Sequence, residues 1–372
     1  MAKILHRMDP PTLVTGPWKL ANLRTGKLGS PKNGLKVFSC FHCGGGSTMG
    51  YKLAGFDVVG GIEIDSDMMK LYRKNHSPRE DLSLLMPIQD FPAMQTPKEL
   101  MNIDVLDGSP PCSSFSTSGS RDEGWNEKRL FREGQTEQVL DDLFFHFIKV
   151  ADILKPKMVI AENVKGLIVG LAKGYVRDIF RAYDKAGYDT QLFLLNSSLM
   201  GVPQMRERTF FISRRRDLGI PKLDLSFNEK PITVGEALKG TTPDGAKELT
   251  GVVREWWKRV PRGKRIADVH PKKHMWDLRK SGPEVVSHTI TATNTPMHWD
   301  SPRFMSPSEV LRLQSFPDDY DFLDQSAGYV CGMSVPPLMM QRVATEVAKA
   351  LLANRAVSSR RPKPSQSETQ AP

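Results

Sequence analysis

The chain has 372 residues, of which 39% are hydrophobic and 25% charged, a composition typical of a globular protein with an ordinary core. Lys and Arg total 52 against 42 Asp and Glu, and the resulting formal charge of +10 favours a polyanionic partner. The sequence has neither an apolar run of 18 residues nor an amino-terminal signal peptide, so we expect a cytoplasmic protein without a membrane span.

The first 34 residues contain Pro, Gly and Lys without periodicity, and we predict an irregular extension or a loosely packed arm there. Predicted strands follow at 35–39, 55–65, 103–111, 157–164, 188–196 and 208–215. Predicted helices lie between many of them: one follows the glycine cluster and runs through about Ala54, and two others lie at 136–154 and 174–187. This alternation predicts an α/β fold with a doubly wound, mostly parallel sheet over residues 35–215.

The composition changes near residue 215, and residues 216–300 show no steady alternation of strands and helices. We predict a smaller second domain there, rich in basic residues and tryptophan. Residues 301–356 are expected to return to the first domain, with a helix capped by Ser306 and Glu309 and an amphipathic helix at 336–356. The polar, Pro- and Ser-rich tail at 357–372 is predicted to be disordered.

A glycine cluster, Gly44 to Gly46, lies between the first predicted strand and its helix, and Glu63 and Asp65 end the next strand. Glycine lets the backbone approach a bound cofactor, and a carboxylate at that strand end can accept hydrogen bonds from ribose hydroxyls. The same pattern fits an NAD-dependent oxidoreductase, or a tight turn that only packs the helix on the strand.

The chain has four cysteines, Cys40, Cys43, Cys112 and Cys331, too few for a disulfide scaffold of this size. Cys40 and Cys43 have CxxC spacing, but no second CxxC or His pair completes a zinc site, so we predict no metal. Cys112 lies in a Gly/Ser/Pro loop directly after a predicted strand. That position puts its thiol at the ligand-binding edge of the sheet and predicts a catalytic nucleophile.

Ordered motifs over about residues 35–350 resemble the cytosine-5 DNA methyltransferase family. They are FHCGGGSTMG (41–50), PPCSSFS (110–116), AENVKG (161–166), PQMRERTFFI (203–212), HTITA (288–292), RLQSFP (312–317) and CGMSVPP (331–337). The resemblance implies a class I methyltransferase, Rossmann-like fold with a target-recognition domain at 216–300. It also implies S-adenosyl-L-methionine as the cofactor, double-stranded DNA as the partner, and a monomer that associates with the nucleoid through DNA in a restriction-modification setting, bacterial or phage.

The resemblance also implies a role for individual residues. Cys112 would attack C6 of a flipped-out cytosine, Glu162 would hydrogen-bond or protonate N3, and Arg208 would contact O2. Arg206 would support the loop or a phosphate. The implied cofactor-binding residues are Phe41, Cys43, Gly44, Gly45, Gly46, Glu63, Ile64, Asp90 and Pro111. The implied substrate-binding residues are Asn163, Met333 and Ser334. The basic residues expected to hold DNA are Arg254, Lys258, Arg259, Arg262, Lys264, Arg265, Lys272, Lys273 and Arg279.

Three positions depart from the family pattern. Cys43 stands where the family usually has glycine, Ser113 where it often has glutamine, and Met333 where it usually has asparagine. We expect Met333 to alter pocket contacts, with a slower reaction or a changed base or cofactor preference. Two alternatives stay open: the same chemistry on RNA, and a catalytically silent DNA-binding homologue. An oxidoreductase would have no use for Pro-Pro-Cys followed by Glu-Asn-Val.

Overall fold

The computed structural model describes residues 12–111, 142–169, 173–273 and 277–358, and the backbone of 128–129 and 138–139. Cys112 and Ser113 lie outside the described residues, and so does the predicted tail from residue 359 onward.

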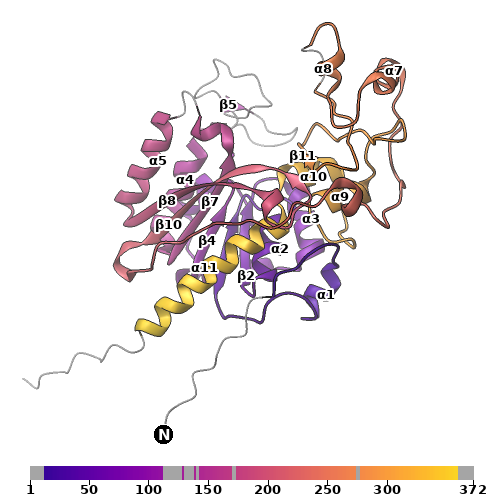
Figure 1. The fold of residues 1–372 in the computed structure, drawn as a ribbon. Coiled ribbons are helices and arrows are strands. Elements are labelled where there is room, and N and C mark those ends of the chain that lie inside the picture. Colours follow the sequence, from indigo (N-terminus) through magenta and orange to yellow (C-terminus); the bar gives the residue numbers. More distant parts are fainter. Residues whose placement is uncertain are drawn as a thin grey trace, which may run out of the picture.

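A seven-stranded sheet forms the centre of the molecule (Figure 1). Its strands, in spatial order, are β3 (Ser83–Leu85), β2 (Asp57–Glu63), β1 (Lys36–Cys40), β4 (Val105–Gly108), β7 (Met158–Val164), β10 (Glu207–Arg215) and β8 (Tyr188–Asn196). β10 runs antiparallel to both of its neighbours, and the other pairings are parallel. The predicted mostly parallel sheet is therefore confirmed.

Helices cover both faces of this sheet (Figure 1). One face packs against α2 (Gly46–Leu53), α3 (Ser66–His76) and α11 (Pro337–Ser358), and the other against α4 (Leu143–Leu154) and α5 (Lys173–Lys185). Adjacent strand residues contribute to opposite cores because side chains alternate along a strand: Val37 belongs to the first core and Phe38 to the second. This arrangement is the predicted doubly wound fold.

The amino-terminal segment differs from its prediction. Residues 12–34 contain one short helix, α1 (Leu20–Arg24), and are otherwise irregular, but Val14, Trp18 and Leu20 are buried in the main core. The indole Nε1 of Trp18 donates to the Ser315 carbonyl at 3.0 Å. Loose packing is therefore wrong for residues 12–34, because apolar side chains without periodicity still bury against a distant part of the chain.

Several element boundaries also differ. The helix predicted at 136–154 begins only at Leu143, and Gln138–Val139 forms strand β6, which pairs with β5 (Lys128–Arg129). β3 and α3 were not predicted. By contrast, strand β8 has the predicted bounds, and Ser306 caps α9 (Pro307–Leu313) through the predicted capping box with Glu309. A further two-stranded pair joins β9 (Gln204–Met205) to β11 (Ser287–His288).

A second, smaller core lies beside α7 (Gly251–Arg259) and α8 (Ile266–Val269), away from the sheet (Figure 1). It is built from Leu249, Val260, Ile266 and Met297. The preceding helix α6 (Val234–Ala237) packs into the main core instead. The chain then returns to the sheet through α9, α10 (Ala327–Met333) and α11. Among the described helices, none is both long and apolar enough to span a membrane.

Candidate active site

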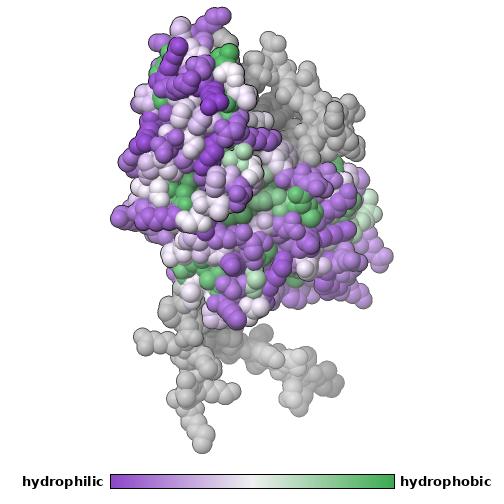
Figure 2. All heavy atoms as spheres, turned by 90° about the vertical axis from the view of Figure 1, so that its right-hand side faces the viewer, coloured by the Kyte–Doolittle hydropathy of each residue, from purple (hydrophilic) through white to green (hydrophobic). Residues whose placement is uncertain are grey.

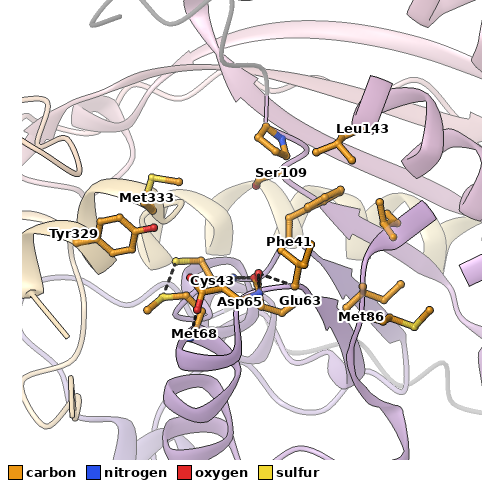
Figure 3. Close-up of a pocket in the computed structure, with 14 residues that line it drawn as sticks. Phe41, Cys43, Glu63, Asp65, Met68, Met86, Ser109, Leu143, Tyr329 and Met333 are labelled. Carbon is orange, nitrogen blue, oxygen red and sulfur yellow. Dashed lines mark hydrogen bonds between the residues drawn. The ribbon is translucent and has the colours of Figure 1, made fainter. Parts of the chain in front are cut away.

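A pocket lies where β1, β2 and β4 end, and it opens to solvent (Figure 3). Ligands of open α/β sheets bind at this carboxyl edge. The residues that line it are Phe41, Cys43, Ile62, Glu63, Ile64, Asp65, Met68, Met86, Ile88, Ser109, Pro111, Leu143, Tyr329 and Met333. Among the predicted cofactor residues, the pocket brings together Phe41, Cys43, Glu63, Ile64 and Pro111.

Glu63 is one of two buried carboxylates that line this pocket, with Asp65, and backbone amides hold it in place. Its Oε2 accepts from the Cys43 N–H at 2.9 Å, and its Oε1 accepts from the N–H groups of Ile64 at 2.9 Å and Asp65 at 3.1 Å. Burial raises the pKa of Glu63, and these amide donors oppose the rise. A carboxylate has about four acceptor positions, so capacity remains for a ligand hydroxyl.

The glycine loop packs away from this pocket, and Gly44, Gly45 and Gly46 do not line it. Gly45 has a φ of +82°, and a Cβ there would lie 2.1 Å from Nε2 of His76. A Cβ on Gly46 would lie 2.1 Å from the Val335 carbonyl oxygen. These glycines are thus required where the loop packs against α3 and the turn between α10 and α11. The alternative of a tight turn that packs the helix on the strand therefore explains why a Cβ does not fit at Gly45 or Gly46.

Asp90 is not brought into the pocket. It lies exposed on a short 3₁₀ helix, Ile88–Ala93, and Ile88 of the same helix lines the pocket instead. Conversely, the sequence reasoning missed Tyr329. Tyr329 and Met333 are four residues apart on α10, so they share one helix face and form the wall opposite Phe41 (Figure 3). That spacing is the signal that would have found Tyr329.

Glu162 and Arg208 form a buried ion pair, with Oε1 of Glu162 3.0 Å from Nε of Arg208. They come from neighbouring antiparallel strands, since Glu162 on β7 pairs with Phe210 on β10. Burial lowers the pKa of the Arg208 guanidinium, and the Glu162 carboxylate beside it opposes that change. The motifs AENVKG and PQMRERTFFI, which begin 42 positions apart in the sequence, therefore meet in this ion pair.

Asn163 connects the end of β7 to the loop that leads to Cys112. Its Nδ2 donates to the Pro110 carbonyl at 2.9 Å, and its Oδ1 accepts from the Val164 N–H at 2.8 Å. Pro111 lines the pocket, and Cys112 follows it directly in the sequence. Among the described residues, Asn163 thus holds the loop segment that leads to the predicted nucleophile.

Arg206 joins three distant segments. Its Nη1 donates to the Ile290 carbonyl at 2.9 Å and its Nη2 to the Gly332 carbonyl at 2.8 Å, and the side chain is buried. The role as a support for the loop is consistent with these contacts, whereas a buried guanidinium is poorly placed to reach a phosphate.

A buried glutamine pair, which the sequence reasoning missed, runs parallel to Arg206. Gln204 donates to Oε1 of Gln314 at 2.6 Å, and Gln314 donates to the Ser334 carbonyl at 2.9 Å. The Ser334 hydroxyl donates to the Val330 carbonyl at 2.8 Å, and Ser334 does not line the pocket. Together these bonds hold the end of α10, where Met333 faces the pocket.

Replacing Arg206 with methionine is expected to lower the free energy of unfolding by about 2–5 kcal/mol, because two buried carbonyls lose their donors. It should also raise the KM for the ligand of the pocket, since the α10 end loses its support. Chemical denaturation and steady-state kinetics measure the two effects. Arg214→Met is the matched control, because Arg214 is also buried and donates to the Ile220 carbonyl at 2.6 Å, away from the pocket. Equal KM effects in both variants would contradict this role.

Comparison with known proteins agrees with this geometry. The family model described as "C-5 cytosine-specific DNA methylase" matches residues 35–349. The Type II methyltransferase M.NgoPII of Neisseria gonorrhoeae is 28% identical over 355 residues, covering 86% of this chain and 97% of the relative. The Type II methyltransferase M.FnuDI of Fusobacterium nucleatum is 32% identical over 193 residues, about half of each chain (52% and 51%).

Solved structures share the fold at lower sequence identity. A protein named for DNA modification methyltransferase activity, from an E. coli prophage, superimposes with a TM-score of 0.64 at 23% identity, covering 86% of this chain and 99% of its own. The DNMT2 of Spodoptera frugiperda superimposes with a TM-score of 0.58 at 19% identity, with the same coverage. The oxidoreductase alternative is therefore wrong. The chain belongs to the C-5 cytosine-specific DNA methylase family and is a DNA (cytosine-5) methyltransferase.

Proposed function

We propose that the pocket binds S-adenosyl-L-methionine and that the protein transfers its methyl group to C5 of a cytosine flipped out of double-stranded DNA. The charge of the pocket carries this proposal. Although the chain has a net charge of +10, the 14 lining residues that the structure describes include Glu63 and Asp65 and no Lys or Arg. A cationic sulfonium suits such a pocket, whereas an anionic pyrophosphate does not.

The shape and polarity of the pocket also suit an adenosine. Phe41, Ile64, Ile88 and Leu143 offer apolar surface to an adenine ring, and Glu63 retains acceptor capacity for ribose hydroxyls. Bound there, S-adenosyl-L-methionine supplies an electrophilic methyl group. Met333 makes the wall opposite Phe41 less polar than the asparagine usual in the family would. We propose that Met333 changes the contacts made in the pocket, while the methyl donor is still S-adenosyl-L-methionine.

Cytosine C5 is a weak nucleophile, and the proposed residues address that problem. The Cys112 thiolate adds to C6, and the ring electrons move toward N3, which takes a proton from Glu162. The resulting enamine is nucleophilic at C5, which takes the methyl group as the S–CH3 bond of the sulfonium breaks, and the N3 proton returns to the Glu162 carboxylate. Transfer of the C5 proton to solvent water then restores the C5–C6 double bond and expels the Cys112 thiolate.

The neighbours of these two residues position the reaction. We assign Arg208, held beside Glu162, to O2 of the cytosine, where a guanidinium can stabilise charge that the ring gains as Cys112 adds. Asn163 fixes the Pro110 carbonyl two residues before Cys112. Flipping is required because the ring faces of a base stacked in a duplex are not accessible to a thiolate.

The lobe that carries α7 and α8 is the proposed DNA-binding surface, and hydrophilic residues dominate it (Figure 2). Of the nine basic residues predicted for this role, Arg259 lies over the Trp256 ring and Arg279 donates to the Gly263 carbonyl. The other seven fall into two groups. Lys258, Arg262 and Arg265 are already in ion pairs with carboxylates. Within the described residues, Arg254, Lys264, Lys272 and Lys273 are exposed and form no ion pair, so their charges are the ones available to phosphates.

Arg254→Ala and Lys264→Ala are each expected to weaken DNA binding across all sequences and to reduce the slope of log K against log salt by about 1. Fluorescence anisotropy with duplex DNA at several salt concentrations measures both quantities. The matched control is Arg181→Ala, which removes the same charge from an exposed position on α5. A salt slope that falls equally in the control would show that only net charge matters.

Bisulfite sequencing of plasmid DNA from cells that express the protein tests the proposed reaction, with Cys112→Ala as the control. Protected cytosines within one short sequence, absent from the control, would support the proposal and identify the recognition site. Protection of RNA alone would favour an RNA substrate. Tight binding of donor and DNA without protection of either nucleic acid would favour a silent homologue.

We further propose that the protein acts as a monomer in the cytoplasm, bound to the nucleoid through DNA.

A further inference from the structure

Sulfur-containing side chains gather at one end of the pocket. Cys43, Met68 and Met333 line this end, and Tyr329 lies beside Met333 on the wall that α10 forms (Figure 3). The Cys43 thiol donates to Sδ of Met68 at 3.6 Å. Among the lining residues that the structure describes, Met86 is the one other residue with sulfur, and it lies at the opposite end (Figure 3). We call the part formed by Cys43, Met68 and Met333 the sulfur-lined end.

Two of the three departures from the family pattern fall at this end. Cys43 has a φ of +47°, in the left-handed region that glycine adopts without strain. A side chain kept in that region against its backbone preference indicates a functional constraint. Met333 faces the pocket from α10. The chain thus has a thiol and a thioether on the walls of one pocket end, where the family usually has glycine and asparagine.

The sulfur-lined end adjoins the position proposed for the ribose. The Cys43 N–H donates to Oε2 of Glu63 at 2.9 Å, and Glu63 is the residue proposed to accept from the ribose hydroxyls. Leu143 and Met86 lie on the other side of Glu63, where apolar surface suits the adenine (Figure 3). In S-adenosyl-L-methionine, one methylene group joins the sulfonium to the ribose, on the side away from the adenine. The sulfonium therefore belongs at the sulfur-lined end.

We propose that Cys43, Met333 and the ring of Tyr329 surround the sulfonium and make the pocket prefer the methyl donor over its demethylated product, S-adenosyl-L-homocysteine. This inference rests on the proposed function, because it takes the donor to be S-adenosyl-L-methionine. Polarisable sulfur atoms and the negative face of an aromatic ring both stabilise a cation. The product has a neutral thioether at the same place, so it gains less from these neighbours.

The chemistry of Cys43 suits a place beside an electrophilic methyl group. A thiolate there would attack the donor, but burial raises the pKa of the Cys43 thiol to about 12, and the Glu63 charge adds to the rise. The thiol therefore stays protonated near neutral pH and is a weak nucleophile. Its contact with Met68 fixes the direction of the S–H group. Cys43 can thus contribute a polarisable surface without consuming the donor.

Isothermal titration calorimetry of the free protein with S-adenosyl-L-methionine and with S-adenosyl-L-homocysteine tests this proposal. The quantity compared is the Kd of the product divided by the Kd of the donor. Met333→Leu removes a sulfur and Tyr329→Leu removes a ring, and each is expected to lower this ratio by about two- to tenfold. Cys43→Gly should lower the ratio in the same way, and it should fold because glycine suits the backbone at this position.

Two matched variants control for general damage to the pocket, which would weaken both ligands alike and leave the ratio unchanged. Met86→Leu removes a sulfur from the opposite end, and Tyr329→Phe keeps the ring, so both should retain the natural ratio. An unchanged ratio in Met333→Leu, Tyr329→Leu and Cys43→Gly, or an equal fall in Met86→Leu, would overturn this inference alone. If the natural protein bound neither ligand, the proposed donor site would be wrong, and this inference with it.

Discussion

Cys112→Ser is expected to lower kcat by on the order of 10³-fold or more while leaving the affinities for DNA and methyl donor nearly unchanged. A serine hydroxyl holds its proton far more tightly than a thiol, so it cannot supply the nucleophile that adds to C6. The hydrogen bonds by which Glu63 shapes the pocket and Asn163 holds the loop do not involve Cys112, so we expect them to persist in this variant.

A covalent trap distinguishes this explanation from a simple loss of binding. Duplex DNA with 5-fluorocytosine at the target base blocks the final elimination, because fluorine at C5 cannot leave as a proton does. The natural protein should form a complex that survives denaturing electrophoresis, and Cys112→Ser should not. A trapped complex in the serine variant, or a kcat within tenfold of the natural protein, would remove Cys112 from the proposed role.

Glu162→Gln is expected to lower kcat by about 10²- to 10⁴-fold, the range that a positioned proton donor contributes. The amide cannot protonate N3, but its oxygen can still accept from Arg208, which limits structural damage. The KM for DNA should change little. Steady-state kinetics measure kcat and the KM for DNA, and the amount of covalent complex with 5-fluorocytosine DNA gives an independent measure of the reaction.

Glu207→Gln is the matched control for that substitution. Glu207 begins the strand that carries Arg208, and its carboxylate pairs with Lys165 at 2.9 Å at the surface. The Glu207→Gln variant loses one surface ion pair, which contributes ~0–1 kcal/mol to stability, and it should keep nearly full activity. If Glu162→Gln and Glu207→Gln lowered kcat equally, the loss would reflect a disturbance of these neighbouring strands and not the missing Glu162 carboxyl.

Elements with strong local signals were predicted well. The bounds of β8 and the capping box at Ser306 and Glu309 depend on residues close together in the sequence, and the structure confirms them. The helix expected from residue 136 was misplaced because apolar spacing alone did not separate it from the β6 strand at 138–139. Three-residue strands such as β3 are too short to show a period.

The site divides in a similar way. Glu63 and Pro111 both line the pocket, because Glu63 ends β2 and Pro111 lies three residues beyond the end of β4, and the ends of parallel strands converge at one edge. Asp90 is exposed on its short helix, since a position in the sequence does not determine which face of that helix turns inward. Tyr329 enters the pocket from a helix more than 260 residues after Glu63.

By itself, the sequence determined the α/β class, the order of the motifs and the kind of chemistry, because strand periodicity, strand ends and reactive residue types are local properties. Only the tertiary structure decided that the glycines of the loop pack against His76 and Val335, that Arg206 joins the segments of Ile290 and Gly332, and that Glu162 meets Arg208 across two neighbouring strands. These relations depend on sheet register and on packing between distant segments, and no local pattern encodes either.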